Sequence, residues 1–262
     1  MSKAGDFSIS GMGQSSGGKF ADLDISGMGK INGDVEAERI TISGKGTIEG
    51  NVILERKLDI SGMGTIYGSV KGGQILSSGS GTIKGAVDVD LVESEGNLKI
   101  EGEARINELE VSGRCRIEAS LKGEKIVSKG LLSVEGDVEA EEFYSNGTFS
   151  IAGLLNANKI EIEVNGYGRV REIGGEFIRV SKGRLTSPFA KLINPFLSDS
   201  REIGKLVVES IEGTAVSLEY TRANVVRGAE VVIGAGCAIK EVEYTDSIKV
   251  DPEAVVQKQT KV

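Results

Sequence analysis

The chain repeats one short motif at a nearly constant spacing, and this repeat restricts the possible folds more than any other feature. ISGMG occurs at Ile9–Gly13, Ile25–Gly29 and Ile60–Gly64, and ISGKG occurs at Ile42–Gly46. Alignment on the first glycine of the motif gives a column that holds glycine in nine successive units: Gly27, Gly44, Gly62, Gly79, Gly96, Gly113, Gly130, Gly147 and Gly166. Most of the steps in this column are 17 residues long. The chain is therefore a tandem array of one small unit.

A second column, four residues later, holds only β-branched residues: Ile31, Ile48, Ile66, Ile83, Ile100, Ile117, Val134, Ile151 and Val170. Within a unit, apolar residues alternate with polar ones, as in Ile40-Thr41-Ile42, which is the pattern of a short strand. Glycine then marks the places where the chain bends. Each unit predicts three short strands, one turn of a parallel β-helix whose turns stack in register. An antiparallel meander is the alternative, but it does not explain why identical residues recur in register.

A single turn of this kind does not fold alone, because its core contacts and backbone ladders come from the turns on either side. The first and last turns each lack one neighbour, so they must be capped or must pair with another chain. We expect the terminal contacts at one end from Phe7, Ile9, Phe20, Leu23 and Ile25. At the other end we expect them from Val231, Ile233, Ile239, Val242 and Tyr244.

Five segments follow from where the register begins, breaks and resumes. They are a flexible N-terminal segment (1–20), the β-helix repeats (21–186), a Pro/Phe-containing insertion (187–204), C-terminal β-helical turns (205–244) and a polar tail (245–262).

The insertion is apolar in a chain whose repeats hold few aromatic residues. Its candidate partner-binding residues are Phe189, Leu192, Ile193, Phe196 and Leu197. It could fold back on the side of the β-helix, or it could capture a partner. The second possibility defines the alternative function, a monomeric β-solenoid binding module.

Composition excludes several chemistries. Among 262 residues there is no His, so an imidazole base, a Ser-His-Asp triad and a His-ligated metal are excluded. Two Cys cannot form a Cys₄ zinc site, and 31 basic against 39 acidic residues, a net charge of −8, disfavours nucleic acid. No phosphate-binding loop motif is present, so we expect no nucleotide. The sequence predicts no catalytic residue, metal or cofactor, and thus no enzyme.

Three weaker patterns have a structural alternative. The column of Glu101, Glu118 and Glu135 has the spacing of paired glycosidase carboxylates, but a solvated charged face is the preferred interpretation. Cys115 and Cys237 could be reactive thiols, although they take a slot that holds glycine elsewhere, so a small packed residue is preferred. The stretch Ile233–Ile239 is similar to hexapeptide-repeat acyltransferases, but it is a single hexad in a 17-residue array.

No run of about 18 apolar residues could span a membrane, and residues 1–20 lack the apolar core of a signal peptide. We therefore expect a cytoplasmic protein. A membrane-binding N-terminal peptide, with peripheral placement at the inner face of the cell membrane, is the alternative to a mobile tail.

The ISGxGxIxGxV unit at this spacing resembles the bactofilin family, from about Leu23 to Val180. The stretch Val216–Ile239 is similar to the ending of longer bactofilin-like proteins. The resemblance implies a triangular, right-handed, single-stranded β-helix that polymerises end to end into non-polar filaments without nucleotide. It further implies a bacterial cytoskeletal scaffold that positions other cellular machinery, with a paralogous bactofilin or membrane-associated machinery as partners. It implies no catalytic residues.

Overall fold

A computed structural model of the chain describes residues 5–183 and 205–262. The described residues form strands and no helix, and they divide into two compact units, Met1–Gly136 (unit 1) and Asp137–Val262 (unit 2). Within each unit the strand pairs are parallel, as in the pairs of β3 with β5 and of β21 with β22. The predicted all-β parallel solenoid is therefore confirmed.

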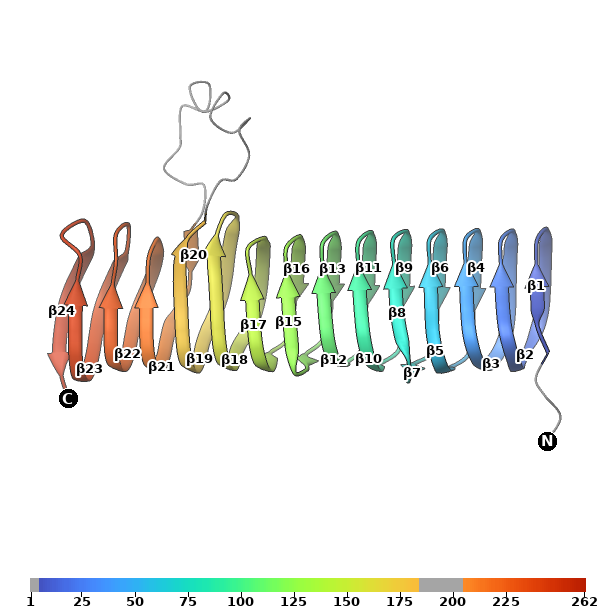
Figure 1. Cartoon of the computed structure of the whole chain (residues 1–262), viewed down its shortest axis with the longest axis horizontal. Coiled ribbons are helices and arrows are strands. Elements are labelled where there is room, and N and C mark those ends of the chain that lie inside the picture. Colours follow the sequence, from blue (N-terminus) through green and yellow to red (C-terminus); the bar gives the residue numbers. More distant parts are fainter. Residues whose placement is uncertain (1–4, 184–204) are drawn as a thin grey trace, which may run out of the picture. The chain divides into compact units, whose positions relative to one another are not determined.

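The described part of unit 1 contains sixteen strands, which stack side by side in Figure 1. They are β1 (Phe7–Ile9), β2 (Met12–Ile25), β3 (Met28–Ile42), β4 (Lys45–Ile48), β5 (Val52–Ile60), β6 (Met63–Ile66), β7 (Val70–Lys71), β8 (Gln74–Ser77), β9 (Ser80–Ile83), β10 (Val87–Ser94), β11 (Asn97–Ile100), β12 (Ala104–Val111), β13 (Arg114–Ile117), β14 (Leu121–Lys122), β15 (Lys125–Ser128) and β16 (Leu131–Val134).

Unit 2 continues the same kind of strand in longer stretches. Its described strands are β17 (Val138–Ser145), β18 (Thr148–Val164), β19 (Tyr167–Lys182), β20 (Lys205–Val207), β21 (Ser210–Leu218), β22 (Thr221–Ile233), β23 (Ala238–Val250) and β24 (Val255–Lys261).

One turn of the solenoid passes through three short strands, for example β6, β7 and β8, before β9 starts the next turn directly beside β6. The register pairs each residue with its counterpart one repeat later, as Ile48 with Ile66 and Ile66 with Ile83. The predicted β-branched column is buried: Ile31, Ile48, Ile66, Ile83, Ile100 and Ile117 are all 0 % exposed. Because equivalent residues of successive repeats stack on one another, the core consists of ladders of like side chains.

The glycine column lies where successive turns come too close for a side chain. A Cβ at Gly44 would lie 2.1 Å from the carbonyl oxygen of Gly27, and one at Gly79 would lie 2.2 Å from that of Gly62. Carbon and oxygen cannot approach so closely without moving the backbone. Glycine recurs in this column because the stacking geometry leaves no room for any other residue.

In the core of successive repeats, a large side chain at one position is matched by a small one four residues away. The Ile of the ISG motif faces a glycine four residues later, and a Cβ at Gly46 would lie 2.8 Å from Cγ2 of Ile42. Further along the chain the small residue moves to the first position and the large one to the second. The successive pairs are Ile25/Gly29, Ile42/Gly46, Ile60/Gly64, Ser77/Gly81, Ser94/Leu98, Val111/Cys115, Ser128/Leu132 and, in unit 2, Ser145/Phe149. At Ser77/Gly81 both members are small, and Leu98 of the following turn reaches over, its Cδ1 3.0 Å from a Cβ placed at Gly81.

The strands extend past both limits expected from the sequence. Residues 1–20 were expected to be flexible, yet β1 and the first half of β2 lie there, paired with β2 and β3. The first turn forms because backbone pairing continues even where its inward positions are small.

Residues 245–262 were expected to be a polar tail, yet β23 runs to Val250 and β24 follows. Here Ile248, Val250 and Val256 continue the columns of Val231, Ile233 and Ile239.

The insertion expected at 187–204 lies outside the described residues. On its two sides the ladder stays in register, because Gly168 of β19 pairs with Leu206 of β20 and Ile173 pairs with Ile211.

Candidate functional site

The first turn of unit 1 is bonded on one side only. Within the described residues β1 pairs with β2, and the Met12–Gly18 part of β2 pairs with β3. The carbonyl oxygen of Ile9 accepts hydrogen bonds from the backbone N–H groups of Ser26 (3.1 Å) and Gly27 (3.0 Å). Since successive residues of a strand direct their backbone groups to opposite sides, the N–H and C=O of Ser8 face away from the second turn. We call residues 7–18 the N-terminal edge.

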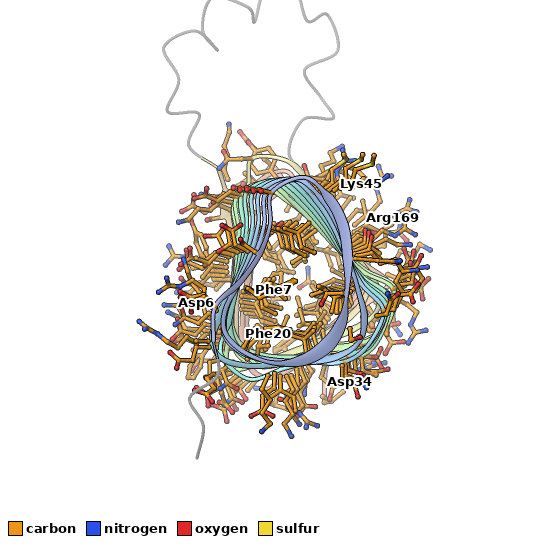
Figure 2. The ribbon with its side chains drawn as sticks, turned by 90° about the vertical axis from the view of Figure 1, so that its right-hand side faces the viewer. Asp6, Phe7, Phe20, Asp34, Lys45 and Arg169 are labelled. Atoms are coloured by element: carbon orange, nitrogen blue, oxygen red, sulfur yellow. The ribbon has the colours of Figure 1, made fainter. Side chains whose placement is uncertain are left out.

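Two aromatic rings, Phe7 and Phe20, lie at the open end of the core inside the first turn, which we call the mouth. The Phe7 and Phe20 ring centroids are 5.6 Å apart with their planes tilted by 38°, and both rings are half-buried. Figure 2 looks onto this first turn and shows both rings inside the ribbon, whereas Asp34 and Lys45 lie outside it. The rings partly cover the open cross-section of the core.

Three of the five residues expected at this end lie at its surface layer, and two lie beneath it. Phe7 and Ile9 are in the first turn, and Phe20 contacts Phe7. Leu23 and Ile25 lie in the second turn, where they pair with Phe7 and Ile9 of the first turn. They are 1 % and 0 % exposed. They support the edge from below.

The remaining inward positions of the first turn hold small residues. Gly13 pairs with Gly29, Ser15 with Ile31, and Gly18 with Val35 of the second turn. The mouth therefore has an aromatic part and a part with little side-chain volume.

No charged residue occurs between Phe7 and Gly18, whose sequence is FSISGMGQSSGG, but the same turn begins beside Asp6 and continues into Lys19, which pairs with Glu36 of the second turn. Exposed strand edges usually carry charged residues, especially lysine, or proline, which prevent pairing with other chains. Lys19 is the one lysine of the described first turn, and it lies at the end of that turn, so the twelve residues before it have the chemistry of a surface that pairs with another strand.

The last turn of unit 2 provides a second open edge. β24 pairs with β23, and Ser247–Val250 of β23 pairs with Glu230–Ile233 of β22. We call residues 247–250 together with 255–261 the C-terminal edge.

The five residues expected at the C-terminal surface lie one turn below it. The register pairs each of them with a residue of the last turn: Val231 with Ile248, Ile233 with Val250, Ile239 with Val256, Val242 with Gln259 and Tyr244 with Lys261. Four of the five are at most 1 % exposed. The expectation stopped one turn too early because the tail looked polar, although adding one repeat of 17 to Val231, Ile233 and Ile239 gives Ile248, Val250 and Val256, three of the four aliphatic residues at the edge.

The C-terminal edge is chemically different from the N-terminal one. It carries lysine at positions 249, 258 and 261, the acidic residues Asp246, Asp251 and Glu253 lie beside its strand segments, and Pro252 lies in the turn between the two segments. Nζ of Lys258 lies 2.5 Å from a carboxylate oxygen of Glu241 in the preceding turn, and that carboxylate raises the pKa of Lys258. Gln259 and Lys261 occupy columns that hold Val242 and Tyr244 one turn earlier. This edge thus carries three lysines and a proline, whereas the described first turn carries one lysine.

The two thiols are packed into the solenoid. Cys115 pairs with Leu98 on one side and Leu132 on the other and is 0 % exposed. Burial raises the pKa of the Cys115 thiol to about 12 and that of Cys237 to about 11. A nucleophilic thiol requires a lowered pKa, so these side chains have the properties of small core residues.

The glutamate column on the outer surface of unit 1 is bound by cations. Lys99 lies 2.9 Å from Glu101 and 3.2 Å from Glu118, and Arg116 lies 3.4 Å from Glu118 and 3.2 Å from Glu135. The hydrogen bond from Lys99 lowers the pKa of Glu101. A glycosidase requires one carboxylic acid with a raised pKa, and Glu101 is shifted in the opposite direction.

The described residues hold neither a cluster of metal ligands nor a membrane-spanning helix. No group of three or more His, Cys, Asp or Glu side chains in residues 5–183 and 205–262 could hold a metal ion. No helix in that part of the chain is long and apolar enough to cross a membrane. Phe189, Leu192, Ile193, Phe196 and Leu197, expected to bind a partner, lie outside the described residues.

Comparison with protein families gives a match over the first third of the chain. Residues 1–88 match the family model described as "Bactofilin: Polymer-forming cytoskeletal". This segment contains the N-terminal edge and the first ISGxG repeats. The resemblance inferred from the repeat is confirmed over the part that the family model covers.

Two proteins of Bacillus subtilis (strain 168) are similar to part of the chain. "Uncharacterized protein YhbF" is 40 % identical over 110 residues, which are 42 % of this chain and 42 % of that protein. "Uncharacterized protein YhbE" is 37 % identical over 112 residues, which are 42 % of this chain and 43 % of that protein. The matched segments thus span less than half the length of both relatives. No solved structure matches the chain.

Proposed function

We propose that this chain, whose first 88 residues match the bactofilin family model, is a building block of a cytoskeletal polymer that assembles through the open edges of its solenoid. The observation that carries the proposal is the N-terminal edge, twelve uncharged residues whose outward backbone groups have no partner in the described chain. An unpaired edge with a long uncharged stretch is a template for pairing with a second chain.

Assembly of this kind needs no bound nucleotide. Its free energy comes from backbone hydrogen bonds across the joined edges and from burial of apolar side chains such as Phe7 and Phe20. A catalytic step is no part of the proposed role. The polymer would act as a bacterial cytoskeletal scaffold that positions other machinery, in the cytoplasm or at the inner face of the cell membrane, as the family resemblance implies.

Removing one outward backbone donor tests the proposal. Ser8 is exposed, and its N–H faces the open side, so Ser8→Pro deletes a donor that has no strand partner among the described residues. Proline is tolerated at an edge strand where the N–H faces solvent. We expect Ser8→Pro to fold with an unchanged circular dichroism spectrum and melting temperature but to assemble poorly.

Ser8→Ala is the matched control, because it changes the same side chain and keeps the N–H. The readout is high-speed sedimentation and negative-stain electron microscopy without nucleotide. Wild-type protein and Ser8→Ala should pellet as filaments, and Ser8→Pro should stay in the supernatant. Wild-type protein that stays monomeric at every concentration would overturn the proposal and would favour the monomeric binding module instead.

Substitution of the buried C-terminal residues is unsuitable for this purpose. Ile233 is 0 % exposed and pairs with Leu218 and Val250. A charge placed there would destabilise the fold before it could report on assembly.

A further inference from the structure

One outward face of unit 2 exposes an aromatic ring in a column that is charged in the turns before it. Phe177 of β19 is 57 % exposed, and the same column holds Lys159 and Glu142 in the two preceding turns. The other four phenylalanines in the described residues are buried or half-buried. An exposed ring that borders further apolar side chains is typical of a contact surface.

Phe177 lines a groove that runs across successive turns of this face. Ala215 and Ser217, in the turn after Phe177, form a low row, and Val232 of the following turn, 41 % exposed, stands on its far side. We call this hollow the apolar groove. Its floor consists of the buried side chains of Ile160, Ile178 and Val216. Such a surface suits aromatic or aliphatic side chains.

A second hollow connects the apolar groove with the place where the described chain stops. Glu161 and Arg179 line both hollows, and the second one continues to Lys182. The described chain stops one residue later and resumes at Lys205. The apolar groove therefore lies beside the start of segment 184–204.

The next turn of the solenoid fixes the residue from which this segment starts. The backbone N–H of Lys182 donates a hydrogen bond to Oε2 of Glu219 (2.8 Å), and Nζ of Lys182 lies 5.1 Å from the centroid of the Tyr220 ring. Tyr220 occupies the position of the glycine column and has a φ of 49°. A side chain fits there because the preceding turn lacks the short glycine corner that crowds this column elsewhere.

We infer that the apolar groove binds the chain's own segment 184–204. Burial of exposed rings and aliphatic side chains from water supplies the free energy for such a contact. The segment contributes the five large apolar residues that were expected to bind a partner, namely Phe189, Leu192, Ile193, Phe196 and Leu197. In this arrangement their partner is a face of the same chain.

The length of the chain permits this contact. Phe177 lies five positions before Lys182, which is about 16 Å along a strand. Phe189 follows Lys182 by seven positions, which span at most about 24 Å when extended. The first aromatic residue of the segment can therefore reach the groove, and the later apolar residues have more chain available.

A hollow near the other end of the segment is a poorer match. It lies on the face that contains Val207 and is lined by three cationic side chains, Arg169, Arg171 and Arg222. Five large apolar residues gain less from a cationic surface than from one built around Phe177 and Val232. This arginine-lined hollow therefore serves as the comparison in the experiments.

The inference does not rest on the proposed polymer. The residues that line the apolar groove belong to neither the N-terminal edge nor the C-terminal edge. Both contacts can form in the same chain, and either can fail alone. If the segment is bound to its own groove, its apolar residues are not free to capture another protein, which argues against the monomeric binding module.

Thiol labelling measures whether the apolar groove is covered. The two native thiols are buried, so a cysteine introduced at an outward position is the reactive one. Val232→Cys reports on the apolar groove, and Ser150→Cys is the matched control in the arginine-lined hollow. Each variant is made in the full chain and again with Phe189→Ser and Phe196→Ser. The rate of reaction with a maleimide is measured below the concentration of assembly, over a dilution series.

The thiol of Val232→Cys should react about tenfold more slowly when the segment is intact than when it carries both serines. The thiol of Ser150→Cys should react at the same rate in the two chains. Equal rates at position 232 would overturn the inference. Protection that is lost on dilution would also overturn it, because the groove would then be occupied by a second copy.

Tryptophan fluorescence provides a second, independent arm. The chain has no Trp, so an introduced indole is the sole one. Phe177→Trp places it in the apolar groove, and Tyr167→Trp, at a position that is 44 % exposed, is the control in the same strand. With Phe189→Ser and Phe196→Ser, the emission of Phe177→Trp should shift to longer wavelength, and that of Tyr167→Trp should not. Emission typical of a solvated indole at position 177 with the segment intact would contradict the inference.

Discussion

At the corners of the solenoid, the backbone of the preceding turn limits the size of each residue. A Cβ at Gly44 would lie 2.1 Å from the carbonyl oxygen of Gly27, whereas a Cβ at Gly11 would have nothing within 4 Å. Both are the glycine of an ISG motif, so the sequence alone does not distinguish them. The difference arises because Gly11 belongs to the first turn, which has no described turn before it.

Gly44→Ala should therefore lower the free energy of unfolding by about 1–3 kcal/mol or more, the cost of forcing extra volume into a packed site. Gly11→Ala, the matched control, should change it by no more than about 0.5 kcal/mol. Urea unfolding followed by circular dichroism measures both. Equal effects would mean that close stacking does not explain the glycine column.

The buried thiol of Cys115 makes stability depend on pH. Its pKa is raised from 9.0 to about 12, so between these values the unfolded chain loses a proton that the folded chain keeps. This contribution to stability is fully present below pH 9 and is lost as pH rises toward 12, with a slope of about 1.4 kcal/mol per pH unit.

We expect the free energy of unfolding to fall more steeply above pH 9 in the wild-type protein than in Cys115→Ala. Lysines and tyrosines titrate in both proteins, so the difference between the two slopes isolates the thiol. Parallel slopes between pH 9 and 11 would show that the thiol ionises in the folded chain.

At the scale of a strand pair, size compensation between the first and second core positions sets the sequence of each repeat. Gly46→Leu alone should be strongly destabilising, because a Cβ there would already lie 2.8 Å from Cγ2 of Ile42. Combining it with Ile42→Ser reproduces the pairing of Ser94 with Leu98 and should recover part of the loss, with a coupling energy of about 0.5–3 kcal/mol.

A double-mutant cycle with Ile42→Ser, Gly46→Leu and both together measures this coupling by chemical denaturation. If the double variant is no more stable than Gly46→Leu alone, the compensation in the sequence has another origin.

The ladders of Ile31 to Ile117 and the glycine corners could be predicted from the sequence because each turn contacts its own repeat 17 residues away. Two features were missed for physical reasons. The first turn was taken as flexible because Gly13, Ser15 and Gly18 bury little apolar area, although its backbone is paired along the second turn. The last turn was taken as a tail because Gln259 and Lys261 interrupt the apolar columns, and that interruption is what marks a protected edge.

The N-terminal half of the candidate site was thus partly predictable, since Phe7, Ile9 and Phe20 are the large apolar residues before the first full repeat. The C-terminal half could be found by continuing the repeat to Ile248, Val250 and Val256, but composition argued against doing so. The difference in charge between the edges depends on knowing which residues form the terminal turns, and this requires the register.

For the whole molecule, the account requires that strands of successive chains stack along the polymer as turns stack within one chain. The most direct measurement is the power spectrum of filaments imaged by electron cryomicroscopy without nucleotide. Strands that stack along the filament give a meridional layer line at about 4.8 Å. Filaments with that line on the meridian are the predicted result. Monomers only, or filaments that show the 4.8 Å spacing across their axis, would contradict end-to-end assembly through the open edges.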